Sequence, residues 1–207
     1  MTKQDWLVKN SGKCILFNSP RDWDLLNSSC PYRLYQFLME LDDIISVANR
    51  EKETEDEYLL KLRHLTRKLI VNTHWISNNI PISDKEIDIS TLYDEPGYPY
   101  TLQREIMLPG SSTFIHNHGT WGIVATLQGM QKNILWKSSP TPDYPHKIEK
   151  TEEKIFKAGD IISFTTNAIH SVEAVGDEPS ITLNIYGETD ALRRLKFDII
   201  RNLSYRF

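Results

Sequence analysis

The segment "GSSTFIHNHGTWGIVATLQG", residues 110–129, decides the fold and the site that the sequence predicts. It places His116 and His118 one residue apart, and five residues separate Gly110 from His116. Successive side chains of a strand point to opposite faces, so a strand here directs both imidazoles to one face and Asn117 to the other. Two imidazoles held in this way can bind one metal ion, but two surface histidines on an exposed strand would give the same pattern.

The composition is that of a globular protein. The chain has 207 residues, 40% of them hydrophobic and 25% charged, which is enough for one domain with a sizeable core. It contains no apolar run that could span a bilayer, and its N-terminus lacks the apolar core of a secretion signal, so we expect a soluble, cytoplasmic protein that does not bind a membrane.

Charge and cysteine content exclude two further classes. The net charge is −4 and basic residues are interspersed with acidic ones, which argues against a protein that binds nucleic acid. Cys14 and Cys30 are too few for a disulfide framework and have no CxxC spacing, in agreement with a reducing compartment.

The N-terminal half predicts helices. Apolar residues recur at three- and four-residue steps from Leu34 to Ile45 and again from Tyr58 to Ile70, on either side of the charged run "NREKETEDE". We expect two amphipathic helices between about Tyr32 and Trp75. Proline and glycine then interrupt residues 76–100, which marks a boundary.

The C-terminal half predicts strands. Short apolar or alternating runs, many of them ending at glycine, proline or polar pairs, are typical of an antiparallel sandwich or barrel. The runs are "TLQREIML", "STFIHNH", "GIVATLQG", "NILWK", "KIFKAG", "DIISFT", "SVEAV" and "SITLNIYG". We therefore predict a mainly β protein with a helical segment over residues 1–100, packed on a barrel over residues 101–207, in a single domain overall.

The spacing of the first histidine pair resembles the first motif of the cupins, whose fold is a jelly-roll β-barrel. That motif runs from a glycine through HxH to a glutamate and a second glycine, and here Gly110, His116, His118 and Gly129 match it. The position of the glutamate falls on Gly122.

A second cupin motif is matched more weakly. His170 follows Gly159 by eleven residues, as the third histidine of that motif does. Thr165, Asn167 and Ala174 replace the proline, glycine and asparagine that the motif prefers. Three imidazoles without a carboxylate leave coordination positions of a metal ion open, which suits redox or Lewis-acid chemistry. We expect the other histidines, His64, His74 and His146, to be solvated or to cap helices.

Within the cupins, "HNHGTWGIVATLQG" resembles the thiol dioxygenases, the family of cysteine dioxygenase and 3-mercaptopropionate dioxygenase. The helix "LRHLTRKLIVNTHWI" and the strand "ITLNIYG" lie where that family has comparable elements. Members bind Fe(II) through three histidines, which implies His116, His118 and His170 as ligands. Mammalian-type enzymes have a cysteine that crosslinks to tyrosine in place of Gly122, so the resemblance is to the bacterial type.

The resemblance implies a set of polar residues next to the iron. Thr182, Asn184 and Tyr186 share one face of their strand by alternation, and buried polar groups there need partners. The family usually has serine, histidine and tyrosine at these positions, so Asn184 replaces an imidazole with an amide that cannot titrate near neutral pH.

Members of the family also bind the substrate carboxylate with an arginine. The candidates here are Arg104, Arg193 and Arg194. For each of them, a solvated surface arginine is an open alternative. The partners implied are a small thiol and O2, and we expect a monomer or a weak homodimer. Two other hypotheses remain: a non-catalytic cupin that acts as a sensor or accessory protein, and a cupin enzyme that uses another metal, such as a Mn or Ni oxygenase or an isomerase.

Overall fold

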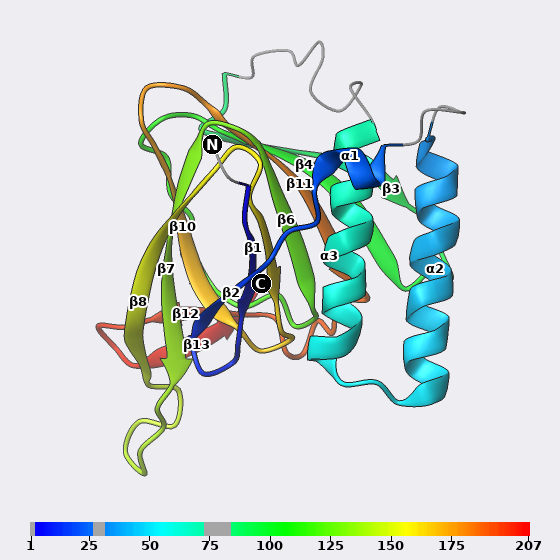
Figure 1. Cartoon of the computed structure of the whole chain (residues 1–207). Coiled ribbons are helices and arrows are strands. Elements are labelled where there is room, and N and C mark those ends of the chain that lie inside the picture. Colours follow the sequence, from blue (N-terminus) through cyan, green and yellow to red (C-terminus); the bar gives the residue numbers. More distant parts are fainter. Residues whose placement is uncertain (1–2, 27–31, 73–83) are drawn as a thin grey trace.

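Two β-sheets face each other, and two long helices lie against the outside of one of them (Figure 1). The computed structural model describes residues 3–26, 32–72 and 84–207. The helices are α1 (Asp22–Leu25), α2 (Leu34–Glu51) and α3 (Glu55–Asn72). The helical pair predicted from the sequence is confirmed as α2 and α3; the expected end at Trp75 lies outside the described residues.

The first sheet has seven strands and the second has six. The order in the first is β2 (Cys14–Phe17), β1 (Asp5–Val8), β9 (Ile161–Phe164), β6 (Gly122–Gln128), β11 (Ser180–Gly187), β4 (Tyr100–Met107) and β3 (Ile87–Asp94). The order in the second is β13 (Leu203–Arg206), β12 (Leu195–Asp198), β5 (Ile115–His116), β10 (Ile169–Val175), β7 (Met130–Ser138) and β8 (Ile148–Lys157).

The strands β4 to β11 form a jelly roll. Four of them are ordered β9-β6-β11-β4 in the first sheet and the other four β5-β10-β7-β8 in the second, which is the arrangement of two Greek keys. The predicted fold class, a mainly β jelly-roll barrel with an N-terminal pair of helices, is confirmed. The first jelly-roll strand begins at Tyr100, next to the predicted start of the barrel at residue 101.

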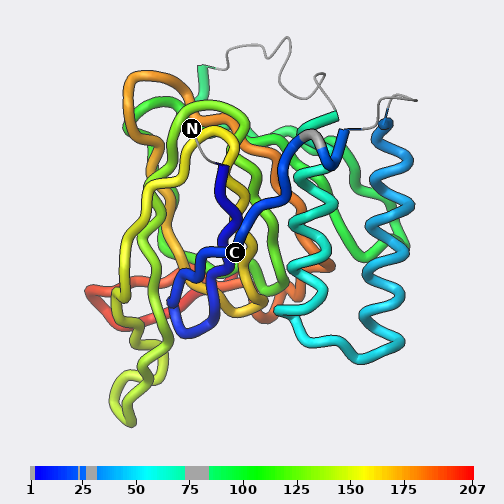
Figure 2. Tube along the Cα trace, viewed as in Figure 1, coloured from blue at the N-terminus to red at the C-terminus, as the bar shows by residue number. Residues whose placement is uncertain are grey.

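The segment before residue 101 is not only helical, contrary to the sequence analysis. It contributes β1, β2 and β3 to the seven-stranded sheet, and β1 pairs in parallel with β9, far away in sequence. In Figure 2, β1 is part of the dark blue trace and runs beside the yellow trace of β9. The sequence pattern missed β1 because its four residues "DWLV" are all buried, so they show no alternation.

The alternation of β11 divides the core into two parts. Leu183 and Ile185 pack with Leu102 of β4 and the buried leucines of α3 on the outer face. Asn184 and Tyr186 point between the sheets, into the interior that contains the histidines. The helices therefore stabilise the outer face of this sheet, and the inner face is left to the site.

A buried ion pair fastens α3 to β1. The guanidinium of Arg67 is fully buried and binds the carboxylate of Asp5, and its remaining N–H groups donate to the backbone oxygens of Gly159 at 3.0 Å and Gln4 at 3.3 Å. The pair joins the helix to the edge of the jelly roll at β9. Removing one partner would leave the other charge buried without compensation.

We predict that Arg67→Met lowers the free energy of unfolding by about 3–5 kcal/mol, because the Asp5 carboxylate stays buried without its partner. Chemical denaturation measures the loss. Arg50→Met is the control, since Arg50 pairs with Glu51 on the exposed face of α2 and such pairs contribute less than about 1 kcal/mol. Equal losses in the two variants would contradict the prediction.

Candidate metal centre

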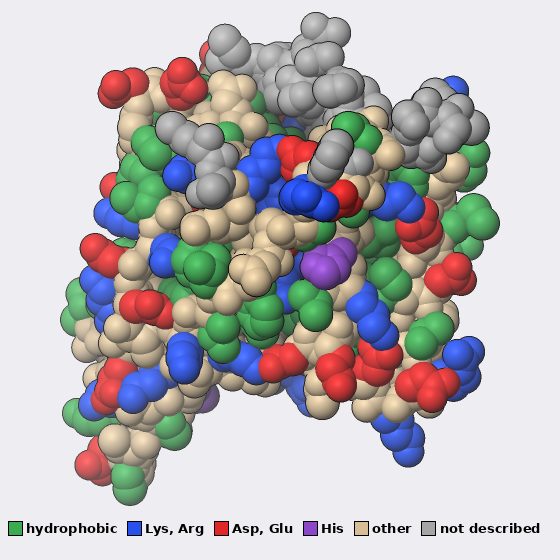
Figure 3. All heavy atoms as spheres, viewed as in Figure 1, with side chains coloured by type: hydrophobic (Ala, Val, Ile, Leu, Met, Phe, Trp, Pro, Cys, Tyr) green, Lys and Arg blue, Asp and Glu red, His purple; other side chains and the backbone are tan. Residues whose placement is uncertain are grey.

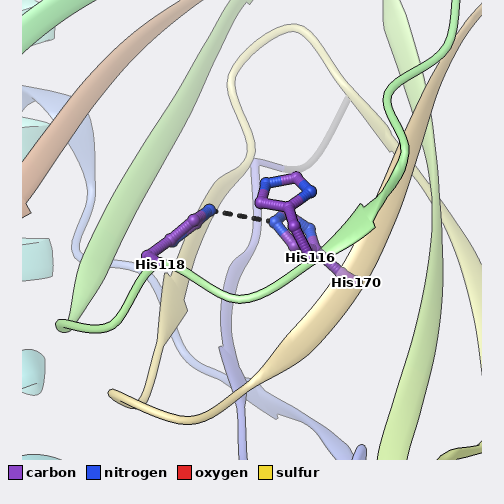
Figure 4. Close-up of side chains that lie close together, drawn as sticks. All are labelled: His116, His118 and His170. Atoms are coloured by element: carbon purple, nitrogen blue, oxygen red, sulfur yellow. Dashed lines mark hydrogen bonds between the residues drawn. The ribbon is translucent and has the colours of Figure 1, made fainter. Parts of the chain in front are cut away.

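Three histidines meet at the inner face of the six-stranded sheet. His116 on β5 lies directly opposite His170 on β10 in the antiparallel register. His118 follows β5 in the connection to β6 and turns its ring toward the other two (Figure 4). The potential ligand nitrogens all lie within 4.8 Å of one another, as the sequence predicts. The sequence predicts a strand that contains both His116 and His118, but β5 ends at His116.

The spacing of one pair of ring nitrogens fits a shared ion. Nε2 of His118 and Nε2 of His170 are 3.1 Å apart. Two nitrogens bound to one ion at about 2.1 Å, and separated by roughly a right angle, lie about 3 Å from each other. The three rings are close as well, with centroids 4.7–5.2 Å apart.

Hydrogen bonds orient two of the three rings. Nδ1 of His116 donates to the backbone oxygen of Phe114 at 2.9 Å, and Nδ1 of His170 donates to Oδ1 of Asn133 at 2.8 Å. Both contacts place the proton on Nδ1 and leave the Nε2 lone pair for a metal ion. Asn133 was not predicted from the sequence, although an asparagine at a buried position of the alternating strand β7 is a visible signal.

The electrostatics favour the ligand form of the imidazoles. Burial lowers the pKa of His116 to about 4, against the hydrogen bond to Phe114, which raises it. Burial also lowers the pKa of His118 and of His170 well below the usual value, with a further decrease from the neighbouring histidines. Neutral imidazole is the form that binds metal ions, so the three residues fit a divalent cation without a carboxylate ligand.

Gly122 leaves room for the rings of His118 and Tyr186. A Cβ at this position would lie 3.0 Å from Nδ1 of His118 and 3.0 Å from the ring of Tyr186. Any side chain here would collide with one of them unless they shifted. The space next to His118 is therefore taken by Tyr186, whose ring centroid is 4.7 Å from that of His118.

A cavity opens from the histidines to the surface. Its outer part has a volume of about 300 Å³ and is lined by His116, His118 and Tyr186 together with Arg194 and Phe207. A smaller inner part of about 40 Å³ reaches all three histidines. The volume of the outer part accommodates a small organic molecule.

The residues predicted beside the metal separate into two groups. Asn184 and Tyr186 line the inner cavity, as the alternation of β11 predicts. Thr182 is fully buried opposite Glu105 and Thr126 and lines neither part of the cavity. Oδ1 of Asn184 and Oγ1 of Thr182 are buried without a hydrogen-bond partner among the described residues. Burial raises the pKa of Tyr186, so its phenol stays protonated and can donate a hydrogen bond.

The three candidate arginines lie in different surroundings. Arg194 lines the outer cavity, and its guanidinium carbon is 4.4 Å from the centre of the Phe207 ring. Arg193 has a side chain that is 65% exposed and pairs with Asp190, away from the cavity. Arg104 lies on β4 between Gln103 and Glu105, which both line the cavity, so alternation places Arg104 on the other face of the sheet.

A glycine turn brings Arg194 to the cavity. Gly119 has a φ of +68°, and a Cβ there would lie 2.7 Å from the oxygen of Asp190 and 2.9 Å from the nitrogen of Arg194. Only glycine combines this left-handed conformation with such close packing. The run "HNHGTWG" thus sets both the His118 ring and the segment that carries Arg194.

The remaining histidines and cysteines lie outside the cavity where they are described. His64 and His146 are exposed, as expected, and His74 lies outside the described residues. Cys14 is not in a disulfide, and Cys30 is also outside the described residues. Acidic and basic side chains are interspersed on the face shown in Figure 3. Among the described residues, no helix is both long and apolar enough to cross a membrane.

Comparisons with known proteins give structural likeness only. No family model matches the sequence, and no curated protein matches it. A cupin superfamily protein from Desulfitobacterium hafniense is similar over 54% of this chain and 84% of its own, with 13% identity and a TM-score of 0.41.

Two further solved structures are similar to a comparable extent. An oxalate oxidase in complex with the substrate analogue glycolate is similar over 52% of this chain and 54% of its own chain, with 15% identity and a TM-score of 0.41. A cupin 2 conserved barrel domain protein from Leptotrichia buccalis covers 56% of this chain and 46% of its own, with 20% identity and a TM-score of 0.41. Similarity at this level assigns neither a family nor an activity to this chain.

We expect His170→Ala to abolish the binding of one divalent metal ion per chain and Asn133→Ala to weaken it by about 10- to 100-fold, because Asn133 fixes the proton of His170 on Nδ1. Anaerobic loading with Fe(II) followed by elemental analysis measures the bound metal, and circular dichroism checks the fold.

Ser171→Ala is the control for these variants. Ser171 follows His170 on β10, and alternation turns its side chain to the opposite face, so metal binding should be unchanged. Undiminished binding in a folded His170→Ala protein would remove this residue from the site.

Proposed function

We propose that this protein is an Fe(II)-dependent thiol dioxygenase that converts a small thiol carboxylate, such as cysteine or 3-mercaptopropionate, to its sulfinate with O2. The observation that carries the proposal is the cavity itself. Three neutral histidine ligands, a phenol that can donate a hydrogen bond and an arginine lie around one space that is large enough for such a substrate.

The donor set suits a metal that must also bind a substrate. Three nitrogen ligands without a carboxylate leave positions open, whereas a structural site normally fills all four. When bound, iron would supply the redox chemistry that allows a thiol to react with dioxygen. The protein would supply the place for each reactant and limit the access of water.

The residues of the chain have separate tasks in this proposal. Arg194 binds the substrate carboxylate with its guanidinium, which the ring of Phe207 holds at the mouth of the cavity. Tyr186 donates a hydrogen bond to the bound reactants next to His118. Phe114 and Phe207, with ring centroids 4.7 Å apart, line the outer part of the cavity beside His116.

The overall reaction balances without another reactant. The S–H bond of the thiol and the O–O bond of dioxygen are broken, and two S–O bonds form. The sulfur is oxidised by four electrons, which both oxygen atoms of one O2 molecule accept. The thiol proton ends on the sulfinic acid or in solvent, so no external reductant is required.

One observation favours a second candidate function, a metal-binding cupin that senses a small molecule without converting it. Asn184 lines the inner cavity where the resembling enzymes have an imidazole, and an amide cannot carry a proton at neutral pH. A sensor needs the binding site but no proton transfer.

Oxygen uptake distinguishes the two candidates. We expect protein loaded with Fe(II) to consume O2 with cysteine or 3-mercaptopropionate and to form the sulfinate, which mass spectrometry detects. Metal analysis of protein purified without added iron distinguishes a site for Fe from one for Mn or Ni. Absence of uptake with every thiol at full iron loading would refute the enzyme and favour the sensor.

Arg194 and Arg193 form a matched pair for the carboxylate contact. We expect Arg194→Ala to raise the KM for 3-mercaptopropionate by about tenfold or more, because a charge-assisted hydrogen bond is lost, and Arg193→Ala to leave it unchanged. Steady-state oxygen uptake measures both. An equal effect of the two substitutions would show that the arginines act through general charge rather than by direct contact.

A further inference from the structure

A carboxylate lies inside the cavity and has no place in the scheme above. Glu105 on β4 lines both the outer part and the inner part that reaches all three histidines. Among the residues that line these two spaces in the described part of the chain, it is the only acidic one. It is not among the residues whose ligand atoms converge on a metal position.

The two charged side chains of the cavity, Arg194 and Glu105, differ in the parts of it that they line. Arg194 lines the outer part only, whereas Glu105 also lines the inner part. The other titratable groups that face this space are the three histidines, which burial keeps neutral, and the protonated Tyr186. Arg194 also lies near the histidines, since its charge lowers the pKa of His116 and of His118, but only the anion lines the inner part of the cavity.

The protein itself compensates Glu105 only in part. Its neighbours in register are Thr182 on β11 and Ile89 on β3, neither of them charged. Burial raises the pKa of Glu105 to about 6, and a hydrogen bond from the side chain of Gln131 opposes the rise. The group is thus mainly a carboxylate at neutral pH, and among the described residues no salt bridge involves it.

This arrangement discriminates between thiols. In the proposed function a divalent metal ion offsets the bound thiolate and Arg194 offsets the substrate carboxylate, so Glu105 is left without a cation of its own. A thiol that also carries an ammonium group brings a cation that can contact Glu105. A buried carboxylate is stabilised by a cation that contacts it and destabilised by an anion.

We propose that Glu105 binds the ammonium group of the substrate and thereby selects a carboxylate-bearing aminothiol over mercapto acids that lack the amine. The inference rests on the proposed function, since it concerns the substrate of the same site. Arg194 contacts the carboxylate at the mouth, and Glu105 contacts the amine deeper inside. Glu105 is then a specificity residue, and it touches the substrate directly.

The test measures binding without turnover. Protein loaded with Co(II) is titrated anaerobically with cysteine, cysteamine and 3-mercaptopropionate, and the sulfur-to-cobalt absorption band reports each Kd. We expect the wild type to bind cysteine more tightly than 3-mercaptopropionate. The Glu105→Gln substitution keeps the shape of the side chain and removes its charge. We expect it to raise the Kd of cysteine and of cysteamine by about tenfold or more, and to leave the Kd of 3-mercaptopropionate unchanged or lower.

Asp94→Asn is the matched control for net charge. Asp94 is exposed at the end of β3 and lines neither part of the cavity, so all three affinities should be unchanged. If Glu105→Gln does not fold, the order of the wild-type affinities still tests the inference, and tighter binding of 3-mercaptopropionate than of cysteine overturns it.

Other outcomes assign Glu105 a different role and overturn the proposal. An equal loss for all three thiols would make Glu105 the base that accepts the thiol proton, or a structural group. No change for any thiol would remove it from contact with the substrate. Failure of the proposed function is distinguishable, because selective binding of aminothiols without oxygen uptake would leave the Glu105 contact intact and refute only the dioxygenase.

Discussion

The pairing of β5 with β10 is the constraint on which the site depends. It sets His116 directly opposite His170, two residues that are far apart in sequence. Neither strand could hold the arrangement alone, since β5 is only two residues long. The jelly roll supplies the register, because its Greek-key order places β10 between β5 and β7, and β7 in turn brings Asn133 to His170.

The interior between the sheets buries polar groups as well as apolar ones. The same exclusion of water that keeps the three imidazoles neutral leaves Oδ1 of Asn184 and Oγ1 of Thr182 without partners among the described residues. Unsatisfied buried groups cost about 1–3 kcal/mol each, and of these two residues only Asn184 lines the cavity, where a ligand can supply the partner. The hydrophobic packing of α2 and α3 on the opposite face of the sheet offsets this cost.

The sequence predicts those features that depend on periodicity and spacing. The helical pair follows from apolar residues at three- and four-residue steps, and the inward direction of Asn184 and Tyr186 follows from the alternation of β11. The convergence of His170 on the HxH pair was predicted from the resemblance to the two cupin motifs. Only the first two features follow from short-range patterns.

Features that depend on the packing of distant segments could not be predicted in this way. Strand β1 shows no alternation of apolar and polar residues, because α3 and the barrel bury both of its faces. Its Asp5 carboxylate pairs with Arg67, which lies on α3. The sequence also does not show which arginine lies at the cavity. That depends on the turn at Gly119, which brings the backbone of Arg194 close to the cavity.

The charge distribution of the cavity follows from the fold rather than from any motif. On β4, alternation places Gln103 and Glu105 toward the histidines and Arg104 toward the other face, so a shift of one residue would exchange an anion for a cation beside the metal position. The register of β4 with β11 sets Glu105 opposite Thr182, on the same face as Asn184 and Tyr186. The pairing of two strands therefore sets the sign of the charge that lines the inner part of the cavity.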